Sequence, residues 1–140
     1  MFTNDRIVSI IDDEIDITDL YHDALRRIDG ISVITFNDPV KALEHFTTNK
    51  KEYVLVLSDY RMPSINGLDL LRKVKSLNPN VRTVLMSAFD VESDHLLKKY
   101  LIEEIINTFI QKPITIFALC NEVNNQIHAH ELLLTGNKKQ

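Results

Sequence analysis

The sequence is poor in cysteine: Cys120 is its only one, which excludes an internal disulfide and a metal site built from several thiolates. A chain without disulfides fits a reducing compartment, and we expect the protein to be cytoplasmic. The sequence also lacks an apolar stretch long enough to form the core of a signal peptide or to span a bilayer. We therefore expect no membrane contact.

Positive charge is scarce as well. The chain has 16 lysines and arginines against 20 aspartates and glutamates, a formal net charge of -4 at pH 7, and its sequence pI is about 5.7. Proteins that bind nucleic acids generally carry a basic surface that displaces counterions from the phosphates. We therefore expect no direct contact with nucleic acid.

The length of the chain sets the number of domains. Its 140 residues, 44% of them hydrophobic, are enough for one compact domain and too few for two ordinary ones. We expect this domain to cover residues 5–131. The remaining residues, 132–140, form a tail that we expect to be partly disordered or to extend the last helix. Nothing after Leu134 looks able to fold as a further domain.

Five short apolar runs rich in β-branched residues are candidate strands. Several are apolar on both faces, which is typical of a parallel sheet that helices cover on both sides. The runs occupy residues 7–11, 32–36, 54–57, 83–86 and 108–110.

Helical patterns fill the intervals between these runs. The clearest has apolar residues at i, i+3 and i+4 spacing from Ile17 to Ile28, with Gly30 as a stop signal. The other four are expected to begin at Asp38-Pro39, after Gly67, within residues 91–104 and after Pro113. We expect the first three helices to bury apolar stripes that include Leu20, Val40 and Leu77 respectively.

Strands that alternate with helices form a (βα)5 chain. Because crossovers between parallel strands are right-handed, we predict an α/β fold with a doubly wound, five-stranded parallel sheet. The flavodoxin-like strand order 2-1-3-4-5 is expected, and functional sites in such folds lie at the carboxyl ends of the strands.

Charged and polar residues follow four of the predicted strands at that edge. Asp12-Asp13, Asp59, Ser87 and Lys112 come directly after the first, third, fourth and fifth strands. Two carboxylates about 4 Å apart repel by roughly 4 kcal/mol at an effective dielectric near 20, so the cluster must hold protons or a cation. Oxygen donors without thiols or imidazoles favour a hard ion, and Mg²⁺ binds in this way together with a phosphate.

This arrangement resembles the receiver domain of response regulators, which work in two-component systems and phosphorelays. The resemblance covers nearly the whole chain. It rests on the acidic pair, Asp59, Met62-Pro63, Gly67, Ser87 and Lys112-Pro113, each after the expected strand.

The resemblance implies a metal site and a phosphoacceptor. Asp59 would accept the phosphoryl group, and Asp13 and Asp59 would ligate Mg²⁺ directly. Asp12 would act through a metal-bound water, and the backbone carbonyl of Arg61 would complete the protein ligands.

It also implies a response to phosphorylation. Lys112 would pair with the phosphoryl oxygens, Ser87 would move to hydrogen-bond phosphorylated Asp59, and Phe109 would take the place of the family's aromatic switch. Because Phe109 lacks a tyrosine hydroxyl, burial alone would have to favour its inward rotamer, and plain core packing is the alternative.

The implied function is that of a stand-alone, chemotaxis-type receiver. It would take its phosphoryl group from a sensor histidine kinase or a phosphotransfer protein, and it would then act on a downstream protein target. The transfer to Asp59 and the slow dephosphorylation would be self-catalysed, so we do not expect a turnover enzyme.

Three other functions compete with this one. A pseudo-receiver would bind partners without phosphorylation. A phosphatase of the haloacid dehalogenase type needs a second acid two residues past its nucleophile, where this chain has Arg61. In a flavodoxin-like FMN carrier, Asp12-Asp13 would repel the ligand's phosphate.

The sequence departs from the family before the fifth strand, where residues 101–107 lack the usual Gly-Ala turn. We expect a longer fourth helix or a longer loop after it. Phe89 and Arg61 occupy positions that tune dephosphorylation in the family, and their bulk predicts a long-lived phosphoryl group. Leu132, Leu133 and Leu134 suggest a homodimer or a partner interface; a helix that folds back on its own domain is the alternative.

Overall fold

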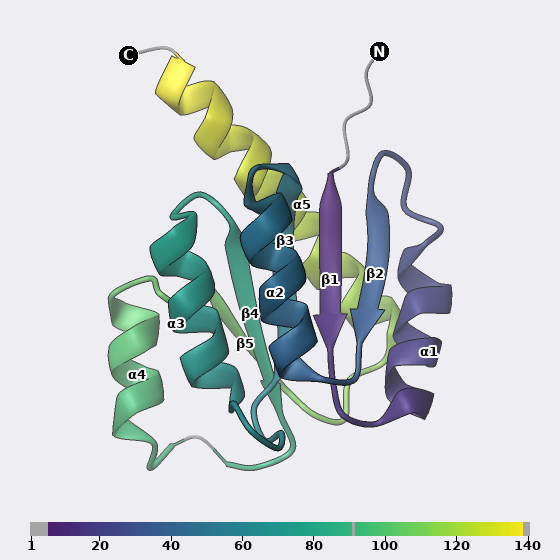
Figure 1. Ribbon diagram of the computed structural model, residues 1–140, viewed down its shortest axis with the longest axis vertical. Coiled ribbons are helices and arrows are strands. Elements are labelled where there is room, and N and C mark those ends of the chain that lie inside the picture. Colours follow the sequence, from purple (N-terminus) through teal and green to yellow (C-terminus); the bar gives the residue numbers. More distant parts are fainter. Residues whose placement is uncertain (1–5, 91, 139–140) are drawn as a thin grey trace.

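The computed structural model describes residues 6–90 and 92–138 as a three-layer α/β fold (Figure 1). Its sheet has five parallel strands in the order β2-β1-β3-β4-β5. In chain order the elements are β1 (Ile7–Ile11), α1 (Ile15–Leu25), β2 (Ser32–Phe36), α2 (Pro39–Asn49), the 3-10 turn η1 (Lys50–Glu52), β3 (Tyr53–Asp59), α3 (Gly67–Leu77), β4 (Arg82–Ser87), α4 (His95–Ile102), β5 (Thr108–Gln111) and α5 (Ile116–Lys138). The predicted fold class and strand order are confirmed.

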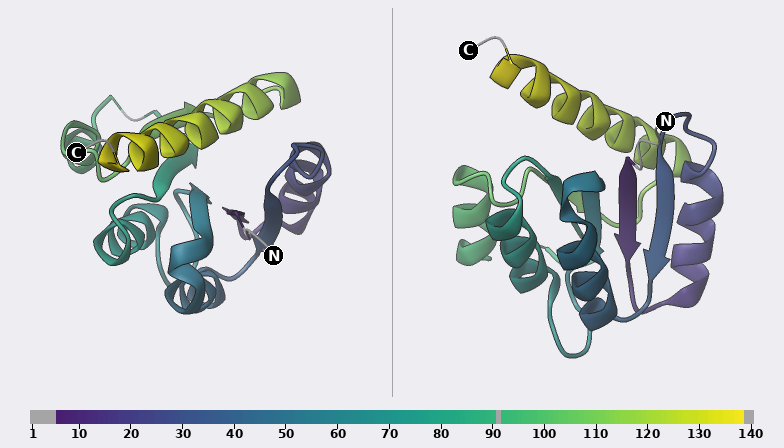
Figure 2. Two further views of the ribbon diagram at one scale, coloured as in Figure 1. Left: turned by 90° about the horizontal axis from the view of Figure 1, so that it is seen from above. Right: turned by 45° about the horizontal axis from the view of Figure 1, so that its top comes forward.

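Helices cover both faces of the sheet. The view from above shows α1 and α5 on one face and α2, α3 and α4 on the other (Figure 2). The three inner strands β1, β3 and β4 have buried side chains on both faces, and every residue of β1 is buried. The doubly apolar runs of the sequence therefore predicted the strands well, because a sheet that helices cover twice needs apolar residues on both sides.

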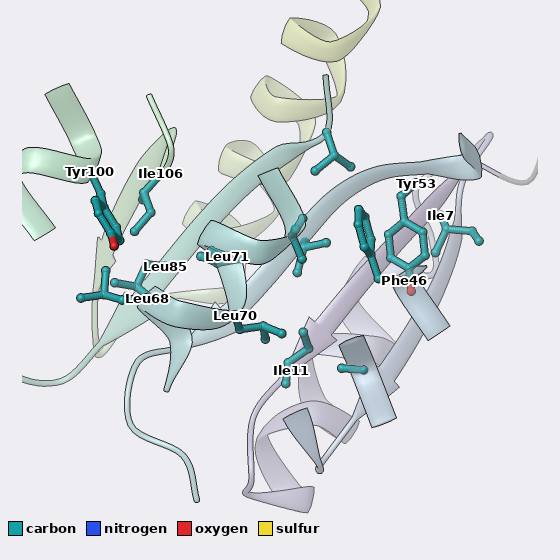
Figure 3. Close-up of a cluster of buried hydrophobic side chains, with 14 of the residues drawn as sticks. Ile7, Ile11, Phe46, Tyr53, Leu68, Leu70, Leu71, Leu85, Tyr100 and Ile106 are labelled. Atoms are coloured by element: carbon teal, nitrogen blue, oxygen red, sulfur yellow. The ribbon is translucent and has the colours of Figure 1, made fainter. Parts of the chain in front are cut away.

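Each face of the sheet has its own hydrophobic core. The α3-side core includes Phe46 of α2, Leu71 of α3 and Tyr53 at the start of β3 (Figure 3). The rings of Phe46 and Tyr53 meet edge to face, with 4.8 Å between their centroids. The α5-side core joins Leu25 of α1 and Val123 of α5. The two cores hold the strands in one rigid layer, so the strand ends are fixed relative to one another.

Three apolar residues that we expected inside are exposed: Leu20 by 50%, Val40 by 40% and Leu77 by 39%. In α1 the buried side carries Thr18, Tyr21 and Leu25, and in α2 it carries Pro39, Ala42 and Phe46. These buried sides include small and polar residues. The prediction considered only large apolar side chains, and it therefore placed Leu20 and Val40 on the buried sides of their helices, where they do not lie. Leu77 lies in the last turn of α3.

The segment without a glycine before β5 forms a tight turn. Helix α4 has 8 residues and ends at Ile102, and residues 103–106 form the turn that leads to β5. Glu104 adopts φ 60° there, in the left-handed region that glycine favours. The side chain of Asn107 then fixes the segment to β4, because its Oδ1 accepts hydrogen bonds from Thr83 N (2.9 Å) and Lys75 Nζ (2.7 Å). Burial and the nearby Arg82 lower the pKa of Lys75 to about 8.

The last helix continues beyond the sheet. α5 runs to Lys138, past the domain boundary expected at residue 131, and its end projects away from the strands (Figure 1). Among residues 116–136 of α5, whose burial is described, His130 is the last buried one; burial lowers its pKa, and its Nδ1 has no hydrogen-bond partner in the described part of the chain. Leu132, Leu133 and Leu134 are exposed, so the described part of this helix does not fold back on the domain.

None of the helices in the described ranges combines the length and the apolar character that crossing a bilayer requires.

Gly67, the first residue of α3, allows α3 to approach the end of β3. A Cβ atom at this position would collide with the backbone oxygen of Asp59 and would lie 2.7 Å from Leu85 Cδ1. The Gly67 N–H also donates a hydrogen bond of 2.7 Å to the Tyr60 carbonyl. No side chain fits here unless the strand that carries Asp59 shifts.

We predict that Gly67→Ala destabilises the protein by about 2 kcal/mol or more, because the collision is with backbone that cannot give way cheaply. Helix propensity alone predicts the opposite, a gain of up to about 1 kcal/mol. Urea unfolding followed by circular dichroism measures the difference. Gly136→Ala is the matched control, because no atom lies within 4 Å of its added Cβ; equal effects of the two substitutions would contradict the close approach.

Candidate functional site

The carboxyl ends of the strands bring three acidic side chains together. Asp12 and Asp13 follow β1 and Asp59 ends β3, and each offers one carboxylate oxygen in a group whose members lie within 4.8 Å of one another. Asp12 is buried, Asp59 is half-buried and Asp13 is exposed. The sequence predicted this convergence, because neighbouring parallel strands end at the same edge of a sheet.

Lys112 bridges two of these three carboxylates. Its Nζ is 3.0 Å from Asp12 Oδ2 and 3.0 Å from Asp59 Oδ1. The side chains of Lys112, Asp12 and Asp59 are only 17%, 2% and 16% exposed, so water screens these ion pairs less than it screens surface pairs. One ammonium group therefore neutralises part of a charge that three carboxylates would otherwise leave uncompensated.

The pKa values of the pair respond to this environment. Burial raises the pKa of Asp59, and the hydrogen bond and charge of Lys112 offset that effect only in part. Burial alone would lower the pKa of Lys112, but the hydrogen bonds and charges of Asp12 and Asp59 outweigh it and leave the pKa above its ordinary value. Lys112 is therefore a cation at neutral pH, and the charge on Asp59 costs free energy in the absence of further positive charge.

Ser87 and Phe109 lie where the sequence put them, at the end of β4 and within β5. Ser87 is buried, and its Oγ accepts a hydrogen bond of 3.0 Å from Phe89 N. The Ser87 carbonyl accepts a hydrogen bond of 2.8 Å from Lys112 N, which joins the ends of β4 and β5. Phe109 is half-buried and packs against the α3-side core.

Arg61 and Phe89 lie together at the mouth of the site. The guanidinium carbon of Arg61 is 4.0 Å from the centre of the Phe89 ring, in a cation–π contact. Both line a pocket of about 420 Å³ together with Asp13, Asp59, Ser87, Lys112 and others. The side chains that the sequence singled out therefore share one cavity, with the exception of the buried Asp12 behind it and of Phe109.

Sequence reasoning missed two polar contacts at this edge. Asn37, after β2, donates a hydrogen bond of 2.8 Å to the Asp12 carbonyl. Tyr60, next to Asp59, donates one of 2.6 Å to Asp94 Oδ2, and the other oxygen of Asp94 accepts from Leu97 N (2.9 Å) and caps α4. Burial and the bond to Asp94 raise the pKa of Tyr60 to about 12. Neither contact leaves a periodic signal in the sequence, because each joins separate loops.

Comparison with protein families decides what kind of domain this is. The family model of the response regulator receiver domain matches residues 8–124. The chain belongs to this family. The match includes β2 to β5 and all of β1 except its first residue, and receivers are signalling modules rather than turnover enzymes.

Individual relatives agree with the assignment. The receiver is 31% identical over 88 residues to the transcriptional regulatory protein CpxR homologue of Haemophilus influenzae. The aligned region covers 63% of this chain and 37% of that protein. It is 27% identical over 109 residues to a probable chemotaxis protein CheY of Rhizobium etli, and this alignment covers 78% of this chain and 82% of that protein. The crystal structure of a receiver domain protein from Clostridium thermocellum is 28% identical, with a TM-score of 0.79, and the match covers 91% of this chain and 98% of that one.

Several of these relatives are much longer proteins. The chain spans 37% of the CpxR homologue and 18% of the transcriptional regulatory protein ZraR of Klebsiella oxytoca. The transcriptional role in their names is a property of those longer proteins. What this chain shares with them is the receiver domain.

We predict that Asp59→Asn stabilises the metal-free receiver by about 1–2 kcal/mol at neutral pH, because it removes a negative charge that is partly buried and lies beside two other carboxylates. Since the pKa of Asp59 is raised in the folded state, the gain is present above that pKa. It shrinks as the pH falls through the folded pKa and disappears below the ordinary value for aspartate.

Urea unfolding in the presence of a chelator, at neutral and at acid pH, measures this gain. Asp69→Asn is the control, because Asp69 is exposed in the first turn of α3 and lies outside the cluster. A stability gain of Asp59→Asn that does not depend on pH would show that charge repulsion is not its cause.

Proposed function

We propose that this receiver accepts a phosphoryl group on Asp59 with the help of Mg²⁺, and that the modified Asp59 changes its binding to a protein partner. The observation that carries the proposal is the shared Lys112 ammonium, 3.0 Å from both Asp12 and Asp59. Asp12 and Asp59 belong, with Asp13, to one group of three carboxylates. A phosphoryl group that forms on Asp59 would meet this cation at once.

The residues present fit a magnesium ion. The donor group consists of the carboxylate oxygens of Asp12, Asp13 and Asp59, and hard oxygen donors are what Mg²⁺ prefers. Asp13, Asp59 and the Arg61 carbonyl would hold the ion directly, and Asp12 would act through a water. When bound, Mg²⁺ would supply positive charge to the carboxylates and to the phosphoryl oxygens.

Asp59 would act as the nucleophile. Its Oδ1 pairs with Lys112, and its Oδ2 has no hydrogen-bond partner among the described residues, so one carboxylate oxygen is available for attack. An oxygen–phosphorus bond would form as the bond between phosphorus and the donor's histidine nitrogen breaks, and the departing imidazole would keep the electron pair and take up a proton. Lys112 would neutralise charge on the phosphoryl oxygens during the transfer.

Ser87 and Phe109 are the residues we propose for the response. Ser87 lies in the same pocket as Asp59, and its hydroxyl could exchange the hydrogen bond from Phe89 N for one to a phosphoryl oxygen. Phe109 packs against the core one strand away, where a change of rotamer would alter the outer surface. The added charge and acceptors thereby bias a local two-state element.

The partners follow from the family. Receiver domains interact with histidine kinases or with phosphotransfer proteins, and we propose one of these as the donor and a further protein as the target. The net charge of -4 supports an output without direct nucleic-acid contact by this chain. The exposed Leu132, Leu133 and Leu134 support a homodimer or a partner surface on α5.

Intact-protein mass spectrometry tests the proposed function. After incubation with a small-molecule phosphodonor, we expect one phosphoryl adduct on the wild type with Mg²⁺, and none without Mg²⁺ or on Asp59→Asn. Asp69→Asn should be labelled like the wild type, because Asp69 is exposed on α3 away from the cluster. No adduct under any condition would leave the pseudo-receiver as the better description.

We further predict that Phe89→Ala shortens the lifetime of the phosphorylated state. Arg61 stacks on Phe89, and both residues line the pocket that contains Asp59, so loss of the Phe89 ring should admit the hydrolytic water. We expect hydrolysis up to about tenfold faster, a barrier change of about 1.4 kcal/mol.

Loss of the labelled mass over time gives this rate. Leu96→Ala is the control, because Leu96 is an exposed apolar residue on α4 that does not line the pocket. A rapid loss of label in the wild type, unchanged in Phe89→Ala, would contradict the shielding role.

A further inference from the structure

We propose that Asn37 is a positioning residue for the metal site, and that it acts by fixing the peptide group between Asp12 and Asp13. The inference rests on the proposed function, because it assigns a role toward the Mg²⁺ that the carboxylates would hold. Asn37 lies in the loop between β2 and α2, on a different strand connection from the acidic pair.

The side chain of Asn37 joins two separate parts of the molecule. Its Nδ2 donates a hydrogen bond of 2.8 Å to the Asp12 carbonyl and another of 2.9 Å to Thr18 Oγ1 in α1. Thr18 is buried, and its hydroxyl donates in turn to the Ile15 carbonyl (3.0 Å). Both hydrogens of the amide are therefore used.

The backbone on either side of Asn37 is also held. Before it, the Phe36 carbonyl accepts a hydrogen bond of 3.1 Å from Asp12 N, which extends the pairing of β1 with β2. After it, the side chain of Asp38 caps α2 by accepting from Val40 N (2.9 Å). Because the backbone around Asn37 is already fixed, its side chain loses little further conformational entropy when it binds the Asp12 carbonyl.

This carbonyl matters because it belongs to the peptide that leads into Asp13. The Asp12 carboxylate has its own partners, Glu14 N at 3.0 Å and Lys112 Nζ at 3.0 Å. The Asp13 side chain makes no hydrogen bond or ion pair within residues 6–90 and 92–138, and it is exposed. The place from which this side chain starts is therefore fixed by the backbone alone, and the Asp12–Asp13 peptide group that Asn37 holds is part of that backbone.

Residues that orient a metal ligand without touching the metal typically contribute about 10- to 100-fold to affinity. Because Asn37 acts on one of the proposed direct ligands, we expect Asn37→Ala to bind Mg²⁺ about tenfold more weakly, at the lower end of that range. The rate of phosphorylation at saturating Mg²⁺ should stay within about twofold of the wild type, since the nucleophile and Lys112 are unchanged.

Two further variants separate positioning from general loosening. Thr18→Val removes the other acceptor of the Asn37 amide but keeps the bond to the Asp12 carbonyl, so it should lower stability and leave Mg²⁺ affinity nearly unchanged. Asn37→Asp keeps the shape and removes both donors. Its extra negative charge would by itself attract Mg²⁺, so a weaker affinity in this variant must come from lost positioning.

The experiment is an NMR titration of the ¹⁵N-labelled chain with MgCl₂ for the wild type and the three variants, with circular dichroism to confirm folding. Weaker binding in both Asn37 variants and unchanged binding in Thr18→Val supports the proposal. Wild-type affinity in the Asn37 variants, or an equal loss in Thr18→Val, overturns it and leaves the proposed function intact. A wild type that does not respond to Mg²⁺ overturns both.

Discussion

The ion pairs of Lys112 with Asp12 and Asp59 are the interaction on which this site depends. The two carboxylates come from β1 and β3 at the centre of the sheet, whereas the lysine comes from the end of β5 at its edge. The lysine must therefore reach past the end of β4, where the small side chain of Ser87 leaves room and the Ser87 carbonyl holds the backbone of Lys112. The position of Lys112 therefore depends on the strand order, on the small size of Ser87 and on the negative charges of the two aspartates.

The sequence predicted most of this arrangement because the physical signals were strong. Strands that are buried on both faces must be apolar throughout, so their positions were visible, and the residue after each strand could be assigned to the shared edge. The helix surfaces were harder. Leu20 and Val40 were expected inside because large apolar residues were counted, whereas the buried stripes use Thr18 and Ala42.

Contacts between loops could not be read from the sequence. Asn37 and Asp12 are 25 positions apart, and Tyr60 and Asp94 are 34 apart; a single hydrogen bond over such a distance has no repeating pattern. The turn at Glu104 shows a related limit, because the absence of a glycine signalled a departure without indicating which residue would take the left-handed conformation. The residues that form the site could thus be predicted from the sequence, whereas the hydrogen bonds between loops that hold those residues in place could not.

The free end of α5 has a geometric consequence. Beyond His130 the helix leaves the sheet and continues to Lys138 at the end of the molecule opposite the site (Figure 1). Eight residues of helix at about 1.5 Å each make an arm of roughly 12 Å. A tilt of about ten degrees where α5 rests on the sheet would move the tip of such an arm by about 2 Å. The projecting helix is therefore a lever that enlarges small motions of the domain beneath it.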